Sequence, residues 1–373
     1  MNAESTTLEI FLALAAEKSP PGRERAVADL VIGFLHELGL EADEDGAGAE
    51  IGSEIGNILC RLPATEQGTP IFLNAHLDTV PPTADIEPVV EEGVVTNRLP
   101  TILGADNKAA IAAMLAAVRD LVRERAPHAG IELLLTPMEE VGLRGAKAFD
   151  SSRLAARFGY CYDQAAPIGE IVLAAPSQRT FLLTFHGRPA HSGIAPEQGR
   201  SAILAAARAI AGMPLGRLDD ATTSNVGLIE GGVAGNIVPP TCTVRAEARS
   251  RDPGRLAETV QAMLDAATSA AEHSDCRLDA AITSEYESYR FDQDDEPVAL
   301  AARALAECGH TVRYIESGGG ADANVFNAAG LPCVNLCNGM AEIHTSEEHI
   351  AVADLDAMTA VTRKLIDLAR GGG

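Results

Sequence analysis

Two residues in the first quarter of the chain have types and a spacing that suit metal chemistry. The apolar segment 71–78 ends on His76 and Asp78, an imidazole and a carboxylate two residues apart. In an extended chain these side chains point to the same side, so Asp78 could hydrogen-bond one imidazole nitrogen while the other nitrogen of His76 faces a metal ion. Taken alone, such a pair is more often just a strand end before a proline turn.

Other carboxylates occupy comparable positions further along the chain. Asp106 precedes an alanine-rich helix, where exposed amides and the helix dipole favour a carboxylate, although a simple helix cap would also explain it. The apolar strand 131–135 leads into Glu139 and Glu140, which repel each other unless a cation or a proton lies between them. A solvated acidic loop is the alternative. Asp163 ends another apolar strand in the same way.

These residues are far apart in sequence but share a position relative to the predicted elements. Each follows a buried strand or begins a helix, and the carboxyl ends of strands in an open α/β sheet are where ligands bind. We therefore expect them to converge at one edge of the sheet. Imidazole and carboxylate ligands together suit zinc, manganese or cobalt better than calcium or magnesium.

The elements that would position these residues alternate between helices and strands. Helical spacing of apolar residues predicts helices at 8–16, 23–38, 297–308 and 352–369. Short apolar runs predict strands at 57–62, 71–78, 89–96, 131–135, 311–315 and 332–336. We expect an α/β fold with a mixed, mostly parallel sheet and helices on both faces.

The pattern changes near residue 178. From there the chain alternates polar and apolar residues in several segments and follows the order β-α-β-β-α-β, which is the ferredoxin-like motif. We interpret 178–291 as a ferredoxin-like α+β domain inserted into a first domain that comprises 1–177 and 292–373.

Composition excludes several classes of partner. The 373 residues are 46% apolar and 22% charged, which is ordinary for a globular protein. With 53 acidic against 29 basic residues the formal charge is −24, so we expect no binding to nucleic acids or anionic membranes. No apolar run reaches the length of a membrane span. The seven scattered cysteines and the absence of a leader-like N-terminus predict reduced thiols in the cytoplasm.

Taken together, the motifs resemble those of the M20 family of metallopeptidases, which includes peptidase T, carboxypeptidases, dipeptidases and N-acyl amino acid deacylases. The resemblance covers nearly the whole chain and is closest to the peptidase T-like branch. Its segments are His-Leu-Asp at 76–78, Gly-Ala-Asp-Asn-Lys at 104–108, Glu-Glu at 139–140, Asp163, Ala-His-Ser-Gly at 190–193, Asn-Ile-Val-Pro at 236–239, Gly-Gly-Gly-Ala-Asp-Ala-Asn at 318–324 and His-Thr at 344–345. Ala321 departs from the serine expected there, which leaves substrate preference open.

The resemblance implies a sheet of the zinc-peptidase type and two divalent metal ions, zinc or else manganese or cobalt, bridged by Asp106. One ion would also be held by His76 and Asp163, and the other by Glu140 and His344. It further implies that the peptide bond after Asp106 is cis.

The resemblance also implies catalytic roles. Asp78 would orient His76, and Glu139 would be the general base for a metal-activated water. His191 would stabilise the oxyanion. In dimeric relatives this histidine comes from the partner's lid, so the resemblance implies that 178–291 is a lid and dimerisation domain and that the protein is a functional homodimer.

Two further residues would contact the substrate. Asn236 would do so from the lid, and Arg249 would pair with a substrate carboxylate. Arg245 and Arg251 are close alternatives for that second role, and a solvated arginine without a ligand is another.

Three functions fit these residues. The first is a cytoplasmic metallo-aminopeptidase that cleaves short peptides such as tripeptides. The second is an N-acyl amino acid deacylase or another amidase with the same fold. The third is a metal-free binding protein on an inherited scaffold, which the complete set of ionisable residues disfavours.

Overall fold

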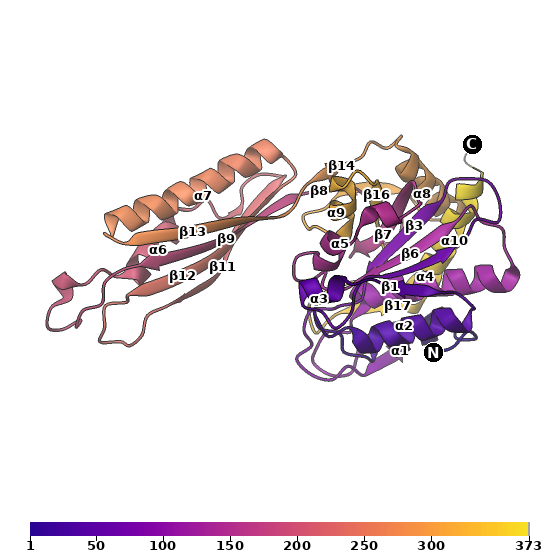
Figure 1. The fold of residues 1–373 in the computed structure, drawn as a ribbon, viewed down its shortest axis with the longest axis horizontal. Helices are drawn as coiled ribbons and strands as arrows, with labels where there is room; N and C mark the ends of the chain where they lie inside the picture. Colours follow the sequence, from indigo (N-terminus) through magenta and orange to yellow (C-terminus); the bar gives the residue numbers. More distant parts are fainter. Residues whose placement is uncertain (372–373) are drawn as a thin grey trace. The chain divides into compact units, whose positions relative to one another are not determined.

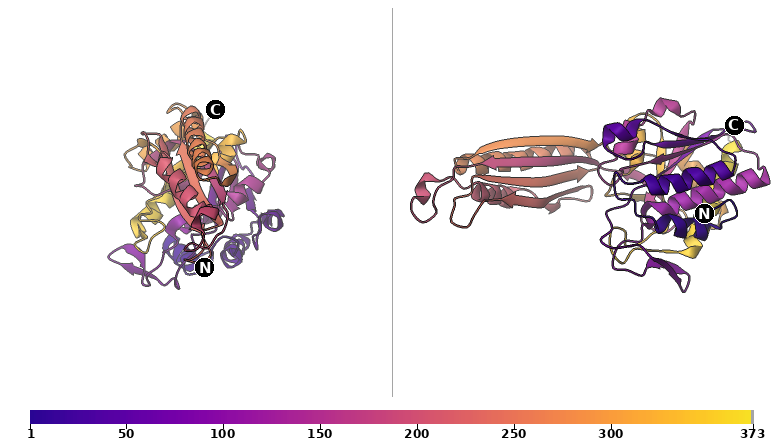
Figure 2. Two further views of the ribbon diagram at one scale, coloured as in Figure 1. Left: turned by 90° about the vertical axis from the view of Figure 1, so that its left-hand side faces the viewer. Right: turned by 60° about the horizontal axis from the view of Figure 1, so that its bottom comes forward.

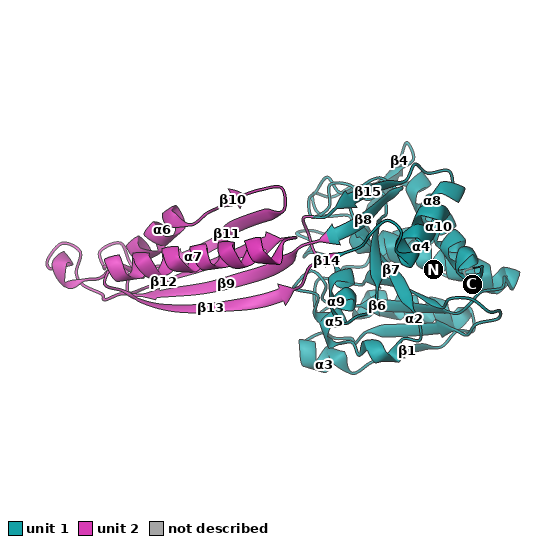
Figure 3. Cartoon of the chain, turned by 90° about the horizontal axis from the view of Figure 1, so that it is seen from above, with its two compact units in different colours: residues 1–174, 290–317, 321–373 teal, residues 175–289, 318–320 magenta. Residues whose placement is uncertain are grey.

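The computed structural model describes residues 1–371, which form two compact units (Figure 3). Unit 1 comprises Met1–Ala174, Arg290–Ser317 and, as far as it is described, Ala321–Gly373. Unit 2 comprises Ala175–Tyr289 and Gly318–Gly320. Whether the middle segment is an inserted domain in its own right stays a prediction.

Unit 1 is built on a nine-stranded mixed sheet (Figure 1). Its strands are Ala42–Glu44 (β1), Ile58–Leu62 (β2), Ile71–His76 (β3), Ile131–Thr136 (β6), Phe158–Gln164 (β7), Glu170–Ala175 (β8), Tyr289–Arg290 (β14), Arg313–Glu316 (β15) and Cys333–Cys337 (β16). They lie in the order β1-β2-β6-β3-β7-β16-β8-β14, and β15 pairs with β8. The central pairs β6–β3, β3–β7 and β7–β16 are parallel, whereas β1–β2, β2–β6 and β16–β8 are antiparallel. The expected mixed sheet is confirmed.

Helices cover both faces of this sheet. They are Thr7–Ala15 (α1), Arg25–Glu37 (α2), Ala47–Ile51 (α3), Ala105–Glu124 (α4), Arg144–Ala148 (α5), Glu296–Glu307 (α8), Asp322–Ala328 (α9) and Val352–Arg370 (α10). Alternate side chains of β3 point to opposite faces of the sheet and show which helix covers each face. Ile71 and Leu73 join the main core with α4, whereas Phe72 packs edge-on against Phe326 of α9, with ring centroids 5.2 Å apart. Thus α4 and α9 lie on opposite faces.

The central helix α4 carries Asp106 at its first turn. It is alanine-rich and buried on nearly all sides, because α1 and α10 pack on it and β3 and β7 lie beneath it. The peptide bond between Asp106 and Asn107 is cis, as predicted. No helix within residues 1–371 combines the length and the apolar character that spanning a membrane requires.

The segment predicted as one strand at 89–96 is instead a hairpin, and that prediction is wrong. Its strands are Pro88–Glu91 (β4) and Val94–Asn97 (β5), and both turn residues, Glu92 and Gly93, have positive φ angles of 50° and 82°. A two-residue turn in which both residues have positive φ matches the right-handed twist of the two strands that it joins. A third strand, His349–Ala351 (β17), pairs with β5. This small sheet anchors the segment next to His344.

Unit 2 has one antiparallel sheet with two helices. Its elements are Ser177–His186 (β9), Ala202–Gly212 (α6), Gly216–Arg217 (β10), Thr222–Gly231 (β11), Thr241–Ser250 (β12), Pro253–His273 (α7) and Arg277–Tyr286 (β13). The strand order is β10-β11-β12-β9-β13. Apart from the short β10, this is the expected ferredoxin-like arrangement, which is confirmed.

Both helices of unit 2 lie on the same face of its sheet (Figure 2). The alternation of β9 explains this, because Phe181, Leu183 and Phe185 are buried against α6 and α7. Leu182 points to the opposite face, where its side chain is 43% exposed. The sheet therefore keeps one open face.

The packing of β3 against β7 gives a stability prediction. Gly159 in β7 lies so close to the Phe72 ring that an added Cβ would overlap it, and the same ring also packs against Phe326. We expect Gly159→Ala to lower the free energy of unfolding by about 1–3 kcal/mol, the usual cost of overpacking. Urea denaturation measures the change.

The matched control is Gly33→Ala in α2, where an added Cβ meets nothing within 4 Å. There we expect a gain of about 0.5–1 kcal/mol, since alanine is the better helix former. Equal denaturation midpoints for Gly159→Ala and the natural protein would contradict the packing described.

Candidate metal centre

The residues predicted to bind metal lie together at the carboxyl ends of the central strands of unit 1. His76 ends β3, Asp163 lies near the end of β7, and Glu140 follows β6. Asp106 stands at the start of α4 and His344 in the loop before β17. Among the described residues, two groups place possible ligand atoms within 4.8 Å of one another: His76, Asp106 and Glu140, and His76, Glu139 and Asp163.

Asp106 lies between the two histidines. Its Oδ1 is 3.1 Å from His76 Nε2, and its Oδ2 is 3.2 Å from His344 Nε2. The same nitrogen of His344 is 3.1 Å from Glu140 Oε1, and that of His76 is 3.7 Å from Asp163 Oδ1. Imidazole nitrogens and carboxylate oxygens that face one another in this way are ligand types for zinc, manganese and cobalt. The residues therefore fit a divalent-metal centre with two sets of donors joined at Asp106.

The carboxyl groups of the centre have shifted pKa values, because they are crowded together and buried. Burial raises the pKa of Asp163 to about 7, with Asp106 and Glu140 adding to the shift. Burial likewise raises the pKa of Glu139 well above its usual range. A divalent cation beside these groups would favour their ionised forms and so oppose both shifts.

The histidines are held by the same carboxylates. Burial by itself would lower the pKa of His76, but its contacts with Asp106, Asp163 and Asp78 outweigh burial and raise it. Hydrogen bonds to Asp106 and Glu140 raise the pKa of His344 to about 10. In return the pKa of Asp106 is lowered despite burial. Each histidine therefore stands where positive charge is favoured.

Asp78 has two kinds of contact at this site. His76 Nδ1 is 2.8 Å from the backbone carbonyl of Asp78 and 3.5 Å from its carboxylate. The carboxylate instead accepts the backbone N–H groups of Glu139 and Glu140, at 2.9 and 3.1 Å. The Asp78 side chain thus fixes the backbone that carries the acidic pair, while its carbonyl orients the imidazole.

Sequence reasoning missed three buried polar residues around the centre. Asn335 in β16 accepts the Asp163 N–H and donates to the Asp163 carbonyl, both at 2.9 Å. Asp322 contacts Thr136 and is buried behind the centre, and burial raises its pKa to about 6. Glu348 binds backbone groups of the Asp106 loop. The signal for Asn335 was a single amide within an apolar strand.

Three predicted residues, His191, Asn236 and Arg249, belong to unit 2. His191 lies in an exposed loop that pairs with the loop of Asn236: the Ser192 N–H donates to the Asn236 carbonyl at 3.0 Å. Arg249 is the penultimate residue of β12 and donates to Glu247 at 3.0 Å. Within unit 2, therefore, the His191 and Asn236 loops precede β12 and Arg249 lies at its other end.

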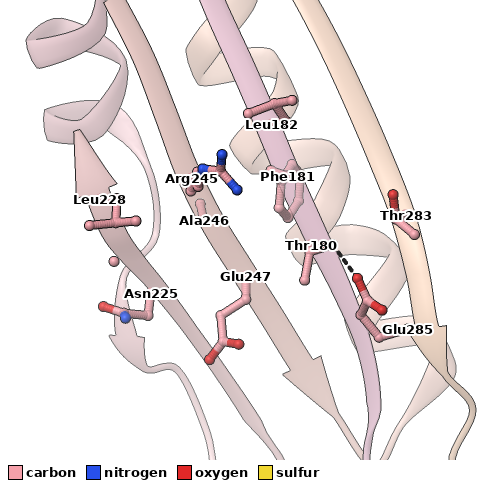
Figure 4. Close-up of a pocket in the computed structure, with 11 residues that line it drawn as sticks. Thr180, Phe181, Leu182, Asn225, Leu228, Arg245, Ala246, Glu247, Thr283 and Glu285 are labelled. Carbon is pink, nitrogen blue, oxygen red and sulfur yellow. Dashed lines mark hydrogen bonds between the residues drawn. The ribbon is translucent and has the colours of Figure 1, made fainter. Parts of the chain in front are cut away.

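The open face of the unit 2 sheet carries a shallow hollow of about 510 Å³ (Figure 4). Arg245, Glu247 and Leu182 project into it from the central strands, and Thr180 donates to Glu285 across one side at 2.7 Å. The lining mixes charges of both signs with apolar side chains. None of the predicted site residues lines it.

Residues 72–368 match the model of peptidase family M20/M25/M40. The chain belongs to this family. The expected resemblance is confirmed, and the protein is a hydrolase of an M20 metallopeptidase family.

Several relatives match along nearly their full lengths. The uncharacterised protein YqjE of Bacillus subtilis is 39% identical, over 94% of this chain and 95% of YqjE. Peptidase T of Escherichia fergusonii is 26% identical, over 90% of this chain and 91% of its own length. The crystal structure of aminopeptidase PepT from Bacillus cereus is 39% identical with a TM-score of 0.87, covering 97% of this chain and 98% of PepT. A tripeptidase from Staphylococcus aureus is 33% identical with a TM-score of 0.92, covering 98% of both chains.

The buried carboxyl groups predict how the metal-free protein responds to pH. The pKa of Asp163, about 7, lies above that of an unfolded aspartate. Its contribution to stability is therefore fully present below about pH 4 and is lost as the pH rises through about 7. Glu139 acts in the same direction. We expect the thermal midpoint of chelator-treated protein to fall from about pH 5.5 to about pH 8.

Asp163→Asn should make this decline shallower, because the variant has no carboxyl group to ionise at that position. Asp85→Asn is the matched control, since Asp85 is an exposed partner of Lys18 with a side chain 78% exposed. Its decline should follow that of the natural protein. Identical declines in the natural protein and Asp163→Asn would show that Asp163 does not titrate in this range.

Proposed function

We propose that the protein is a cytoplasmic aminopeptidase that uses two divalent metal ions to cleave short peptides, with tripeptides as the preferred class. The observation that carries this proposal is the position of Asp106 between His76 and His344, with Glu139 beside them. The aminopeptidase and tripeptidase crystal structures, 39% and 33% identical to this chain, support the choice of substrate.

The proposed ligand sets are His76, Asp106 and Asp163 for one ion, and Asp106, Glu140 and His344 for the other. Zinc fits these donors, and manganese and cobalt are alternatives. When bound, such ions polarise a carbonyl group and make water more acidic.

Glu139 would act as the general base and then as the general acid. It is 9% exposed, and its backbone is fixed by the Asp78 carboxylate. A carboxyl group with a pKa raised by burial holds a proton more readily than one in water. Glu139 would take a proton from the attacking water and return it to the leaving amine.

His191 would donate a hydrogen bond to the oxyanion. The Gly193 N–H donates to His191 Nδ1 at 3.2 Å, so the neutral ring carries its own proton on Nε2. That arrangement leaves an exposed ring with an N–H donor available, which suits an oxyanion partner.

The length of β12 supports a homodimer formed through unit 2. Asn236 and His191 lie in loops that precede its first residue, Thr241. Arg249 lies eight residues further along the strand, roughly 26 Å from Thr241 at the usual strand rise. A tripeptide spans only about 10 Å. If all three residues contact one substrate, they must come from two copies of the chain.

Arg249 would bind a substrate carboxylate. It lines a hollow of about 280 Å³ in unit 2 together with Arg217 and Arg251, and one carboxylate, that of its own partner Glu247, lines the same hollow. Planar guanidinium groups match a carboxylate with paired hydrogen bonds, and this concentration of cations favours an anionic group.

The state of the cysteines supports a reducing compartment. All seven are free within residues 1–371, and five are buried. Buried thiols without partners are typical of cytoplasmic proteins, where disulfides are rare.

The proposal predicts the effect of removing the base. Glu139→Gln keeps the side-chain size but removes the proton acceptor, so we expect kcat on tripeptides to fall by about 10²–10⁴-fold while bound metal is retained. Steady-state kinetics and metal analysis of the same samples measure this. The control is Glu91→Gln, an exposed residue in β4, which should leave kcat unchanged.

The same assay compares tripeptides with N-acetyl amino acids. Aminopeptidase action requires a free α-amino group, so the tripeptides alone should be cleaved. Cleavage of only the N-acetyl compounds would make the protein a deacylase. No hydrolysis and no retained metal would favour a binding protein on this scaffold.

A further inference from the structure

Glu348 is an acidic side chain buried beside the metal centre without being one of its expected ligands. It is 2% exposed. Its Oε2 accepts the backbone N–H groups of Leu103 and Gly104 at 2.7 and 2.8 Å, and its Oε1 accepts that of Asp106 at 3.0 Å. One carboxylate therefore holds three backbone donors of the loop that leads into α4.

The loop is shaped to receive an anion. Gly104 has a φ angle of 80°, in the left-handed region that glycine tolerates, and this bend turns neighbouring N–H groups toward one point. Successive amides arranged in this way form a concave anion site. In this chain the anion is a side chain from 242 residues further along the sequence.

Glu348 also ends the loop that carries His344. Ala341 and His349 close this loop with two backbone hydrogen bonds, of 3.0 and 3.1 Å. Within it the Thr345 hydroxyl donates to the Glu342 carbonyl at 2.7 Å. Directly after Glu348, β17 pairs with β5 and fixes the loop to the small sheet. The loop is therefore firmly held at the end where Glu348 lies.

We propose that Glu348 is a positioning residue that sets Asp106 and His344 at the spacing needed to share a metal ion. This inference rests on the proposed two-metal function. Asp106 lies at the start of α4 and His344 in the loop before β17. The Glu348 carboxylate is a direct link between them, because it accepts the Asp106 N–H and lies four residues after His344.

The strength of the link follows from its chemistry. Hydrogen bonds to a buried carboxylate are stronger than those between neutral groups. Replacing Glu348 by glutamine leaves one acceptor oxygen for three N–H donors. The new side-chain NH₂ group would then face a backbone N–H group, and two donors cannot bond to each other. At least one buried donor is then unsatisfied, and the Asp106 loop relaxes away from His344.

Cobalt(II) binding tests this role without any substrate. Glu348→Gln and the natural protein, both stripped with chelator, are titrated with Co²⁺ and followed by visible absorption, which reports the number and geometry of the ligands. We expect the ion held by Asp106, Glu140 and His344 to bind about 10–100-fold more weakly in the variant, the usual cost of losing a residue that orients ligands.

Glu347→Gln is the matched control, because it removes the same charge from the neighbouring, exposed position. Its cobalt spectrum and affinity should equal those of the natural protein. Thermal unfolding of the metal-free variants separates a loss of fold from a loss of ligand spacing. If Glu348→Gln does not fold, Glu348→Asp, which keeps the charge but is one methylene shorter, is judged by the same criterion.

Natural affinity and an unchanged cobalt spectrum in the folded Glu348 variant would overturn the inference, even if its thermal midpoint were lower. A natural protein that binds no cobalt would instead overturn the proposed function. The two failures are therefore distinguishable.

Discussion

The structure depends on one electrostatic constraint: several carboxylates lie close together where little water reaches them. Asp106, Glu139, Glu140 and Asp163 share a small space, with Asp322 buried behind them. Two imidazoles oppose this charge only in part. Such a cluster is unfavourable unless protons or cations neutralise it. Burial, and then the charge of the neighbouring carboxylates, therefore raises the pKa values of Glu139 and Asp163. The cluster lowers the stability of the metal-free fold, but its carboxylates are well placed to bind divalent metal ions.

The fold positions these groups by fixing the backbone that carries them. Asp78 binds the amides of the acidic pair, Asn335 binds both backbone groups of Asp163, and Glu348 binds the amides around Asp106. Each of these side chains acts on the main chain next to a functional residue. The functional carboxylates themselves keep their oxygens directed at one another and at the histidines. Positioning and chemistry are thus carried by different residues.

Much of the fold and the centre could be predicted because the signals were local. A buried strand that ends on His76 or runs into Glu139 is visible in a few residues, and strand ends meet at one edge of a parallel sheet. The positioning residues could not be found in this way. Asn335 is 172 residues from its backbone partner, and nothing local distinguishes buried Glu348 from its exposed neighbour Glu347. The hairpin of β4 and β5 was missed because Glu92 is an unusual residue for a turn with positive φ.

The central claim is that the clustered carboxylates and histidines hold two metal ions joined at Asp106. Mass spectrometry of protein reconstituted with excess zinc and then desalted tests it most directly, with Asp106→Ala measured beside the natural chain. The account predicts about two ions per natural chain and a sharp loss in the variant, because both donor sets lose their shared ligand. A natural chain that retains no zinc, or a variant that retains both ions, would contradict it.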